Sequence, residues 1–513
     1  MAVPADRPRM KFILFAFLAG LASALGFEPL GLWPLTLIAF AYLMWLLQRA
    51  PSLRSALALG WWFGVGQFVL GLNWIATSFT YQSAMPAWLG WVSVVLLSLY
   101  LAVYPAMAAG LAWRYARKDW LALVFLFAAA WIVTEWLRAT MFTGFAWNPV
   151  GVSLLPTAAA RLATIVGTYG LSGLALLIAG ALLLIYERYR KTGFILLVAI
   201  TGIALLRWGF DVPSAGPAGL QLAVIQPNIG QEDKWTPGFE DRNFAELARL
   251  SVPRHPGPRL LLWPEAAITE PLQDERRNFQ ASRNAEAVRR RVAGILGPED
   301  LLLTGGVTIQ SADGVLVTSA TNSVYAMKRD GQILGRYDKA HLVPYGEYLP
   351  ARPILSRIGL SRLSPGAVDF YSGPGPATFD LPGIGKVGFQ VCYEIIFSGQ
   401  VIDRNNRPNF LYNPSNDAWF GRWGPPQHLA QARLRAIEEG LPVVRSTPTG
   451  ISAVVDADGG IMGAIPWRRA GALNVLLPPA KEPTLFSKVG NIAPFLLALL
   501  LIGIAIAVRR RAR

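Results

Sequence analysis

The stretch KVGFQVCYE, residues 386–394, decides how the polar part of this chain is interpreted. Its first six residues predict a β-strand, and Cys392, the single cysteine of the chain, follows them directly. A lone thiol cannot form a disulfide within the chain, so it packs as a small hydrophobe, binds a metal or acts as a nucleophile. Packing is the commonest of these roles, but a sharp turn at the end of a strand can present a nucleophile. Residues elsewhere in the chain decide between the two.

The composition indicates a membrane protein. Of 513 residues, 53% are hydrophobic and 15% are charged, whereas soluble domains carry about 25% charged residues. The apolar residues form runs near bilayer length, as in membrane spans. The net charge of +15 does not indicate a nucleic-acid partner, because many Lys and Arg residues lie in short loops between these runs and no basic stripe interleaved with aromatics occurs in the polar region. With three histidines and one cysteine we expect no metal site and no cofactor.

Eight apolar segments divide the chain into three parts. Seven of them precede a long stretch of ordinary soluble composition, and the eighth follows it. They lie at about residues 12–26, 31–47, 57–77, 87–112, 119–138, 160–186, 193–209 and 488–508. The sequence therefore predicts a transmembrane region at 1–211, a polar domain at 212–486, and a final span with a basic tail at 487–513.

The basic residues predict the orientation of these spans. Lys and Arg cluster before the first span, in every second connection and after the last span, whereas the alternate connections are poor in charge. By the positive-inside rule, both termini lie in the cytoplasm and the polar domain lies on the other side of the membrane. A cleaved signal peptide is an alternative at the N-terminus, with an apolar core at 12–21 and a cleavage site at 22–24. Cleavage would leave the polar domain on the same side.

The polar domain alternates short β-type runs with helical stretches. Gly, Pro and Asp separate the runs, which is typical of strands joined by turns. Predicted strands cover 221–226, 259–263, 301–307, 322–327, 386–391, 409–413, 443–446 and 452–455, and predicted helices cover 278–293 and 427–439. This pattern indicates an α/β fold in which helices face the sheets.

Four polar residues at or near the ends of these elements could act together in catalysis. Glu265 follows the second strand, Lys339 and Glu347 lie in the segment 337–347, and Cys392 ends a strand. A thiol is mostly protonated at neutral pH, so it needs a base such as a partly desolvated carboxylate. A lysine can favour the thiolate and then the oxyanion of a tetrahedral intermediate, and a second carboxylate can hold that lysine. Each residue alone is better explained by a structural or surface role, but the combination favours catalysis.

Two other nucleophile arrangements are disfavoured. No Gly-x-Ser-x-Gly motif occurs in the chain, which weakens a serine-hydrolase interpretation. A papain-like Cys-His pair would need His255, His341 or His428, and none of these has a supporting motif.

The same residues resemble a known family. WPE at 263–265, DK at 338–339 with HLVPYGE at 341–347, and CYE at 392–394 resemble the Glu-Lys-Cys signature of the nitrilase/carbon–nitrogen hydrolase superfamily. The flanking spans, the polar domain before the last span, and residues 231–235 narrow the resemblance to the bacterial apolipoprotein N-acyltransferase family. The resemblance implies an α-β-β-α sandwich on the periplasmic face of an eight-span bundle in the bacterial inner membrane.

The resemblance also implies an acyl transfer in two steps. Cys392 would attack the sn-1 ester of a phospholipid, typically phosphatidylethanolamine, and form a thioester. The α-amino group of a diacylglyceryl-modified cysteine at the N-terminus of an apolipoprotein would then take the acyl chain. By this resemblance Glu265 is the general base, Lys339 stabilises the oxyanion and Glu347 assists.

Further residues are predicted to support catalysis or to contact lipid. The family needs additional positions for activity or lipid contact, which correspond to Tyr393, Glu394 and Trp235. An apolar segment of the polar domain adds three aromatic residues, Trp419, Phe420 and Trp423. Exposed clusters of this kind often mark a membrane surface, so we predict that this segment enters the outer leaflet and gates lipid entry. The alternative is that its aromatic side chains only cap the sheet.

Two other functions remain open. A membrane-tethered amidase of the nitrilase type could hydrolyse a small amide with the same residues, and only the lipid-facing topology favours transfer over hydrolysis. A transporter or assembly scaffold with an outer binding module is disfavoured by the few charges within the spans and by the Glu-Lys-Cys set.

Overall fold

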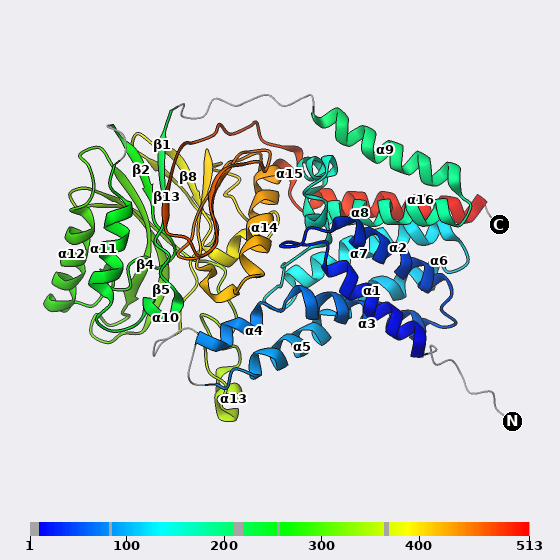
Figure 1. Ribbon diagram of the computed structural model, residues 1–513, viewed down its shortest axis with the longest axis horizontal. Coiled ribbons are helices and arrows are strands. Elements are labelled where there is room, and N and C mark those ends of the chain that lie inside the picture. Colours follow the sequence, from blue (N-terminus) through cyan, green and yellow to red (C-terminus); the bar gives the residue numbers. More distant parts are fainter. Residues whose placement is uncertain (1–9, 82–84, 209–218, 254–256, 364–368, 512–513) are drawn as a thin grey trace.

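A helical bundle and an α/β domain lie end to end in this protein (Figure 1). The computed structural model describes residues 10–81, 85–208, 219–253, 257–363 and 369–511. The predicted boundary between residues 211 and 212 lies outside these ranges. The α/β domain occupies the chain between the last two long helices of the bundle.

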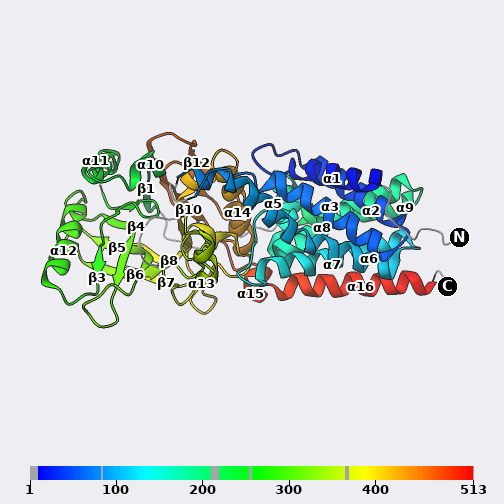
Figure 2. The same cartoon turned by 90° about the horizontal axis from the view of Figure 1, so that it is seen from below.

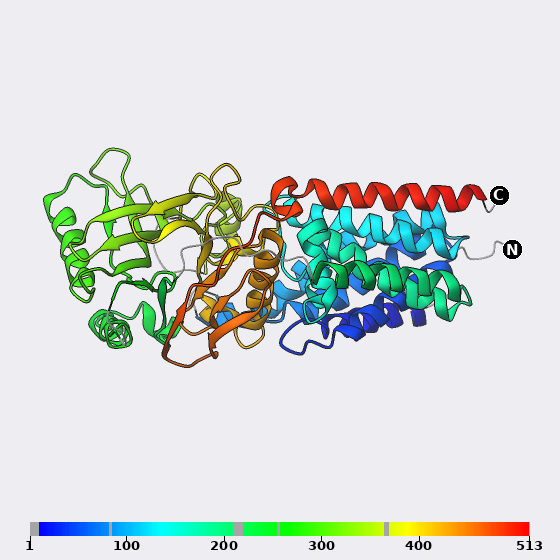
Figure 3. The same cartoon turned by 90° about the horizontal axis from the view of Figure 1, so that it is seen from above.

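The bundle is built from apolar helices, and each predicted apolar segment falls on one or more of them. Their bounds are α1 (Met10–Ala24), α2 (Trp33–Gln48), α3 (Leu53–Gly71), α4 (Ile75–Ser78), α5 (Leu89–Leu101), α6 (Val103–Ala116), α7 (Trp120–Thr140), α8 (Ala163–Tyr186), α9 (Arg190–Trp208) and α16 (Ile492–Arg511). Figures 2 and 3 show α16 running along the bundle beside α7. The protein is therefore a multi-pass helical membrane protein with a large α/β domain.

The number of candidate spans is smaller than the eight predicted. Helical stretches that are long and apolar enough to cross a membrane are Leu89–Ala116, Trp120–Thr140, Ala158–Tyr186 and Ile492–Arg511, and Leu53–Gly71 with Ile75–Tyr81 makes a fifth if this pair, bent by 50°, is one span. α1 and α2 have 15 and 16 residues, which is less than the roughly 20 that a hydrocarbon core requires. α9 carries Arg190, Lys191 and Arg207 within its 19 residues. α1 and α2 are therefore too short by this measure, and α9 is not among the candidate spans of the described residues.

Two breaks in the helices follow from the local sequence. Pro105 has no N–H to donate to the carbonyl of Leu101, and α5 ends at Leu101. Gly167 has a φ of 65°, and the ring of Phe486 lies 2.1 Å from the position that a Cβ would occupy. Only glycine fits both this backbone and this contact, so α8 kinks where α15 (Leu485–Val489) packs against it.

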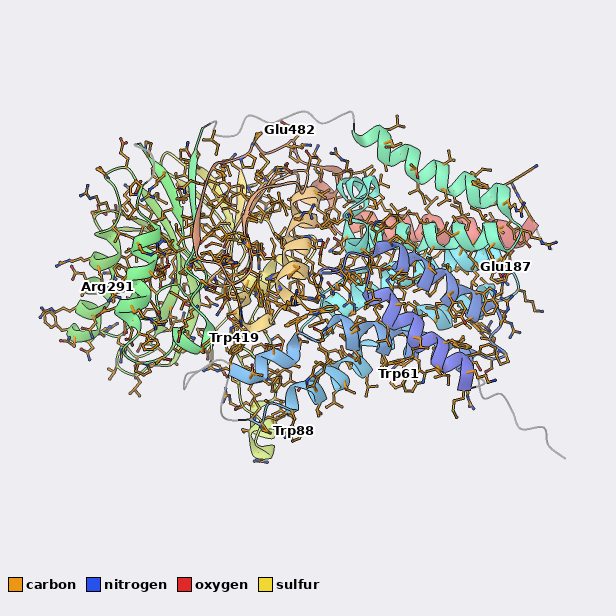
Figure 4. The ribbon with its side chains drawn as sticks, in the orientation of Figure 1. Trp61, Trp88, Glu187, Arg291, Trp419 and Glu482 are labelled. Carbon is orange, nitrogen blue, oxygen red and sulfur yellow. The ribbon has the colours of Figure 1, made fainter. Side chains whose placement is uncertain are left out.

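Basic connections lie together at the end of the bundle that is far from the α/β domain. Arg49, after α2, is 3.6 Å from Glu187, after α8, and its guanidinium lies 5.7 Å from the ring centre of Trp120 at the start of α7. Figure 4 shows Glu187 at the opposite end of the molecule from Arg291 of the α/β domain. The connections that the positive-inside rule groups together in the sequence are therefore neighbours in space.

The α/β domain contains two sheets. Their strands are β1 (Gln221–Gln226), β2 (Arg259–Leu262), β3 (Gln273–Asp274), β4 (Leu301–Gln310), β5 (Ser319–Lys328), β6 (Ile333–Asp338), β7 (Thr378–Leu381), β8 (Gly385–Phe389), β9 (Phe410–Pro414), β10 (Val443–Ser446), β11 (Ser452–Val455), β12 (Ile461–Ile465) and β13 (Gly471–Leu476). One sheet has the order β13-β1-β2-β4-β5-β6 with β3 paired to β4, and the other has the order β12-β11-β10-β9-β8-β7. β1 and β13 pair antiparallel, and the N–H of Leu477 donates to the carbonyl of Leu220 at 2.9 Å.

Alternate residues of the strands face two different cores. On β1, Leu222 and Val224 join the apolar cluster that contains Val443 of the other sheet, whereas Ala223 and Ile225 join the cluster of the outer helices. The helices α11 (Glu240–Leu250) and α12 (Phe279–Ala293) cover the first sheet, and α14 (Gly424–Glu439) covers the second (Figure 1). The domain is an α-β-β-α sandwich, as predicted. Shorter helices are α10 (Gln231–Lys234) and α13 (Arg352–Leu355).

Polar contacts join α14 to the bundle. Glu438 accepts hydrogen bonds from the backbone N–H and the hydroxyl of Thr168 at 2.5 and 2.6 Å. The indole of Trp147 donates to the side-chain oxygen of Gln427 at 2.8 Å. Arg435 lies 2.8 Å from Glu438, and both side chains are buried. α14 is thus enclosed between the second sheet and the helices of the bundle.

Candidate active site

Cys392 lies in a sharp turn three positions after the end of β8. Its φ of 51° is in the left-handed region, which residues other than glycine rarely adopt. It begins the short 3-10 helix η5 (Cys392–Ile396) and is 5% exposed. The turn predicted at the strand end is present, and it holds the single thiol in a strained backbone conformation.

Lys339 lies between two carboxylates in the interior of the domain. Its Nζ is 2.8 Å from Oε2 of Glu347 and 3.8 Å from Oε1 of Glu265. Glu265 follows β2, whereas Lys339 and Glu347 lie in the segment after β6, and all three side chains are buried. The structure therefore brings the predicted lysine and both predicted carboxylates into one cluster.

Asn322 of β5 joins the two carboxylates, and the sequence did not single it out. Its Nδ2 donates to Oε1 of Glu265 at 2.7 Å and to Oε1 of Glu347 at 2.9 Å. In the part of the chain that the structure describes, Oε2 of Glu265 is buried and has no hydrogen-bond partner. Glu265 thus keeps one free oxygen, which is the arrangement a general base requires.

The charges of this cluster act on the lysine and on the thiol. Burial by itself would lower the pKa of Lys339, but Glu347 and Glu265 outweigh it and raise that pKa above its ordinary value. Burial and the charge of Glu265 raise the pKa of the Cys392 thiol, and Lys339 opposes them. Lys339 is therefore charged at neutral pH, while the thiol is protonated and needs a base.

Glu394 connects the nucleophile turn to the loop after β6. Its Oε2 accepts a hydrogen bond from the N–H of Val391 at 2.6 Å. Its Oε1 accepts from the hydroxyl of Tyr337 and from the N–H groups of Ala340 and His341 at 2.9, 2.7 and 3.0 Å. One buried carboxylate therefore holds the two chain segments that carry the thiol and the lysine.

A loop of the bundle also contacts this region. The hydroxyl of Tyr393 donates to the carbonyl of Gly144 at 3.3 Å, and Nε2 of His341 lies 2.9 Å from the carbonyl of Thr143. Tyr393 is buried beside the nucleophile. This predicted supporting residue thus links the turn to the segment that follows α7.

Lys234 is a second buried amine near the site, and it was not predicted. Its Nζ donates to the backbone carbonyl of Glu265 at 2.9 Å. Burial lowers the pKa of Lys234 to about 8, although the charges of Glu265 and Cys392 oppose this shift. With Glu265 it lines a small pocket. Its neighbour Trp235 is 39% exposed. Lys234 and Trp235 both lie in the segment 231–235, which narrowed the family resemblance, so this segment was the signal by which the sequence could have pointed to Lys234.

The predicted lipid-contacting aromatics lie where the domain meets the bundle. Phe420 was predicted to be exposed, but it is buried because its ring packs against Trp74 at 4.6 Å between ring centres. Trp419 is half-buried, and its ring lies 5.9 Å from that of Tyr81; Figure 4 shows it near the end of α4. Trp423 is half-buried as well. The prediction of an exposed aromatic cluster is therefore wrong for Phe420.

The arrangement supplies the groups needed for nucleophilic acyl transfer. It combines a thiol, a carboxylate with one free oxygen and a charged lysine, all shielded from solvent. Among the described residues, no group of three or more His, Cys, Asp and Glu side chains is placed to hold a metal ion. The chemistry that these side chains support is covalent catalysis by the thiol.

Comparisons with known proteins cover both parts of the chain. The family profile described as "Apolipoprotein N-acyltransferase N-terminal domain" matches residues 19–181, and that described as "Carbon-nitrogen hydrolase" matches residues 221–481. The apolipoprotein N-acyltransferase of Rhodopseudomonas palustris is 34% identical over 525 aligned positions, which cover 98% of this chain and 96% of that protein. That of Bradyrhizobium diazoefficiens is 35% identical over 525 positions, which cover 98% and 95%.

Solved structures similar to the α/β domain include Nit3 of Saccharomyces cerevisiae, a member of branch 10 of the nitrilase superfamily. It is 17% identical, with a TM-score of 0.37, and the match covers 51% of this chain and 90% of that one. The relatives at 34% and 35% identity, by contrast, match along nearly their whole length and include both the bundle and the α/β domain. This chain belongs to the apolipoprotein N-acyltransferase family, and its α/β domain is a carbon–nitrogen hydrolase domain.

Proposed function

We propose that this enzyme transfers a fatty acyl chain from a phospholipid to the amino terminus of a lipoprotein through a thioester on Cys392. The observation that carries the proposal is the near full-length likeness to curated acyltransferases, which includes the bundle as well as the hydrolase domain. Burial of the thiol and of Glu265 supports it further, because a thioester persists for transfer only where water is excluded.

In the first half-reaction, the free oxygen of Glu265 takes the proton of the Cys392 thiol. The sulfur attacks the carbonyl carbon of the phospholipid ester, and Lys339, held by Glu347, stabilises the oxyanion. The C–O bond of the ester then breaks, and Glu265 returns the proton to the leaving oxygen. A lysophospholipid departs and the acyl chain remains on the sulfur.

In the second half-reaction, an amine replaces the sulfur. The α-amino group of the lipoprotein, whose ordinary pKa of about 7.7–8.0 leaves part of it uncharged near neutral pH, attacks the thioester carbonyl. Glu265 takes a proton from the amine, the C–S bond breaks, and Cys392 regains a proton. The products are an amide and the free enzyme.

The proposed substrates are phosphatidylethanolamine, acylated at sn-1, and a lipoprotein whose N-terminal cysteine carries a diacylglyceryl group. Trp235, Trp419 and Trp423 are proposed to contact lipid, because they are exposed or half-buried. Tyr393 and Glu394 are proposed to support the nucleophile through the hydrogen bonds described above.

The proposed topology has eight spans, with both termini in the cytoplasm and the hydrolase domain on the periplasmic side of the inner membrane. In this assignment α1, α2 and α9 complete the set of spans. The domain limits are 1–211, 212–486 and 487–513. The neighbouring basic connections at the far end of the bundle support a cytoplasmic position for that end.

Intact-mass analysis of the purified full-length protein incubated with phosphatidylethanolamine tests the proposal. We expect a mass increase of one fatty acyl group that hydroxylamine removes and that is absent in Cys392→Ala. Because the chain has a single cysteine, no other thiol can carry the adduct. Addition of a diacylglyceryl peptide should discharge the adduct and yield the N-acyl peptide.

Two outcomes would contradict this function. Release of free fatty acid without an adduct that a peptide amine can accept would indicate a hydrolase of the amidase type. If Cys392→Ala acylated lipoproteins at the full rate, the reaction could not pass through a thioester on Cys392.

A further inference from the structure

We propose that His428 of α14 is a positioning residue that holds the nucleophile turn by its backbone carbonyl. The inference rests on the proposed function, in which Cys392 forms the thioester. No sequence motif pointed to His428, and the reaction described above does not use it.

His428 reaches the turn from the helix that faces the bundle. Its Nε2 lies 3.1 Å from the carbonyl oxygen of Cys392. A carbonyl oxygen can only accept a hydrogen bond, so Nε2 carries the proton and donates it. Nδ2 of Asn413, on β9, approaches the same oxygen at 3.5 Å. Two buried side chains therefore anchor the carbonyl of the nucleophile.

The turn needs such an anchor because of its backbone conformation. A left-handed φ is unfavourable in a residue other than glycine and persists only where the surroundings enforce it. The direction of the Cys392 carbonyl is set by the same backbone torsions that direct its Cβ. Holding the oxygen therefore also fixes the direction in which the sulfur points toward Glu265 and Lys339.

A buried ion pair orients the imidazole of His428. Its Nδ1 lies 2.9 Å from Oδ1 of Asp417 and 3.0 Å from Nη2 of Arg445. Asp417 and Arg445 pair with each other, and all three side chains are fully buried. Burial and the charge of Arg445 lower the pKa of His428, whereas Asp417 and the carbonyl of Cys392 oppose this shift.

Aromatic rings from both parts of the molecule pack on this imidazole. The ring centre of Trp147, from the bundle, lies 5.3 Å from that of His428, and the ring centre of Phe420 lies 5.7 Å away. Trp147 also donates to Gln427, the neighbour of His428 on α14. The bundle thus contributes directly to the support of the nucleophile, and Phe420 has a role other than lipid contact.

Substitutions of His428 can separate the hydrogen bond from the packing. His428→Phe keeps an aromatic ring but has no donor, whereas His428→Gln loses the ring and places an amide N–H near the position of Nε2. We expect His428→Phe to slow thioester formation in a single turnover by about 10²-fold, the effect of a misplacement near 1 Å, with little change in KM for phosphatidylethanolamine. His428→Gln should recover most of the rate.

A second measurement reports on the turn itself. Alkylation of the single thiol by iodoacetamide, followed by mass, gives the pH dependence of Cys392 reactivity. In His428→Phe the sulfur of Cys392 should move away from Glu265 and Lys339. The pH at which alkylation is half-maximal should then fall toward the ordinary thiol pKa of about 8.5. His428→Gln should keep the wild-type pH profile. Leu429→Ala, a packing change on the same helix, should lower thermal stability without moving the profile.

The outcomes distinguish this inference from the function on which it rests. Equal rates for His428→Phe and His428→Gln, or an unchanged alkylation profile in His428→Phe, would overturn the role of His428 and leave the thioester mechanism intact. Should His428→Phe fail to fold, His428→Asn, whose shorter amide lies near Nδ1, replaces it in the same comparison with His428→Gln. Thioester-independent activity of Cys392→Ala would instead overturn the proposed function.

Discussion

Lys234 and Lys339 both lie near Glu265, but their pKa values are shifted in opposite directions. Lys339 lies beside Glu347 and Glu265, whose charges raise its pKa despite burial. Lys234 has the backbone carbonyl of Glu265 as its hydrogen-bond partner, and burial lowers its pKa to about 8. The site therefore combines a permanent cation with one that titrates near neutral pH.

The titration of Lys234 predicts a pH-dependent stability. Its folded pKa lies below the ordinary lysine value of about 10.4, so the unfolded chain binds more protons than the folded one above about pH 8. The contribution of Lys234 to stability should therefore rise from about pH 8 to about pH 10. We expect the Tm of the wild type, measured in detergent relative to that of Lys234→Met, to increase over this range.

The comparison with Lys234→Met cancels the titration of groups that do not interact with Lys234; Glu265 and Cys392 do interact with it. Lys481→Met, which removes a lysine that pairs with Asp458 near the surface, provides a second reference and should not show this rise. A Tm difference that is constant from pH 7 to pH 10 would show that Lys234 keeps an ordinary pKa.

The sequence could indicate some site residues but not others. Glu265, Lys339 and Cys392 stand at strand ends in motifs that resemble a known signature, so they could be proposed together. Asn322 lies inside a predicted strand, and nothing local shows that its amide reaches two carboxylates 57 and 25 positions away. His428 likewise acquires its contact with the nucleophile only through tertiary packing.

At the scale of elements, α14 shows why burial was hard to predict. Its sequence contains Gln427, His428, Arg435, Glu438 and Glu439, which suggests a helix with a solvated face. All five are buried, because the bundle covers the face that a soluble domain would expose. The sequence correctly predicted a helix at 427–439 but could not show what lies on its second side.

The missed strands have a different physical cause. β12 and β13 are exposed or half-buried at nearly every position, whereas β1 is buried at all but its first position. β7 has four residues and ends its sheet. β6 merges in sequence with the catalytic segment that follows it. Pairing with a neighbouring strand, rather than local pattern, determines these elements.

The Arg435–Glu438 pair predicts how α14 stabilises the junction. Glu438→Leu leaves a buried guanidinium without its charge partner, which typically costs about 3–5 kcal/mol. The double variant Arg435→Met/Glu438→Leu removes both charges and should lose less stability than Glu438→Leu alone. Thermal unfolding of the detergent-solubilised proteins measures both effects.

Arg433→Met provides the matched control, because it removes a half-buried guanidinium from the same helix. It should change the Tm only slightly. If the double variant lost as much stability as Arg435→Met and Glu438→Leu lose together, the ion pair would not couple Arg435 to Glu438.

At the scale of the whole molecule, hydropathy and geometry give different counts of spans. Each of the eight apolar segments falls on helices within the described residues, but α1 and α2 are short and α9 is not among the candidate spans. Hydropathy records composition, whereas a span also requires length. Basic connections lie together at the end of the bundle that is far from the hydrolase domain, which is the arrangement of the proposed topology.

The proposed topology predicts which residues are accessible from outside the cell membrane. In a Cys392→Ala background the chain has no thiol, so a single introduced cysteine can be labelled selectively. Arg329→Cys, on the hydrolase domain, should react with a membrane-impermeant maleimide in intact spheroplasts. Lys118→Cys, between α6 and α7, should react only after the membrane is opened, because the proposed topology places it on the cytoplasmic side.

Both positions are exposed to solvent, so a difference in labelling reports the side of the membrane rather than burial. Labelling after lysis provides the control that each cysteine can react. Reaction of Lys118→Cys in intact spheroplasts would reverse the proposed orientation.

The antiparallel pairing of β1 with β13 has a consequence for how such a protein can arise. The polypeptide enters and leaves the hydrolase domain on adjacent strands, which lie about 4.8 Å apart. A domain whose two ends lie side by side can be inserted into a helical membrane protein, because the membrane protein needs only one point of insertion. A single insertion is then sufficient to join a domain of this kind to a lipid-embedded host and bring its active site close to the bilayer.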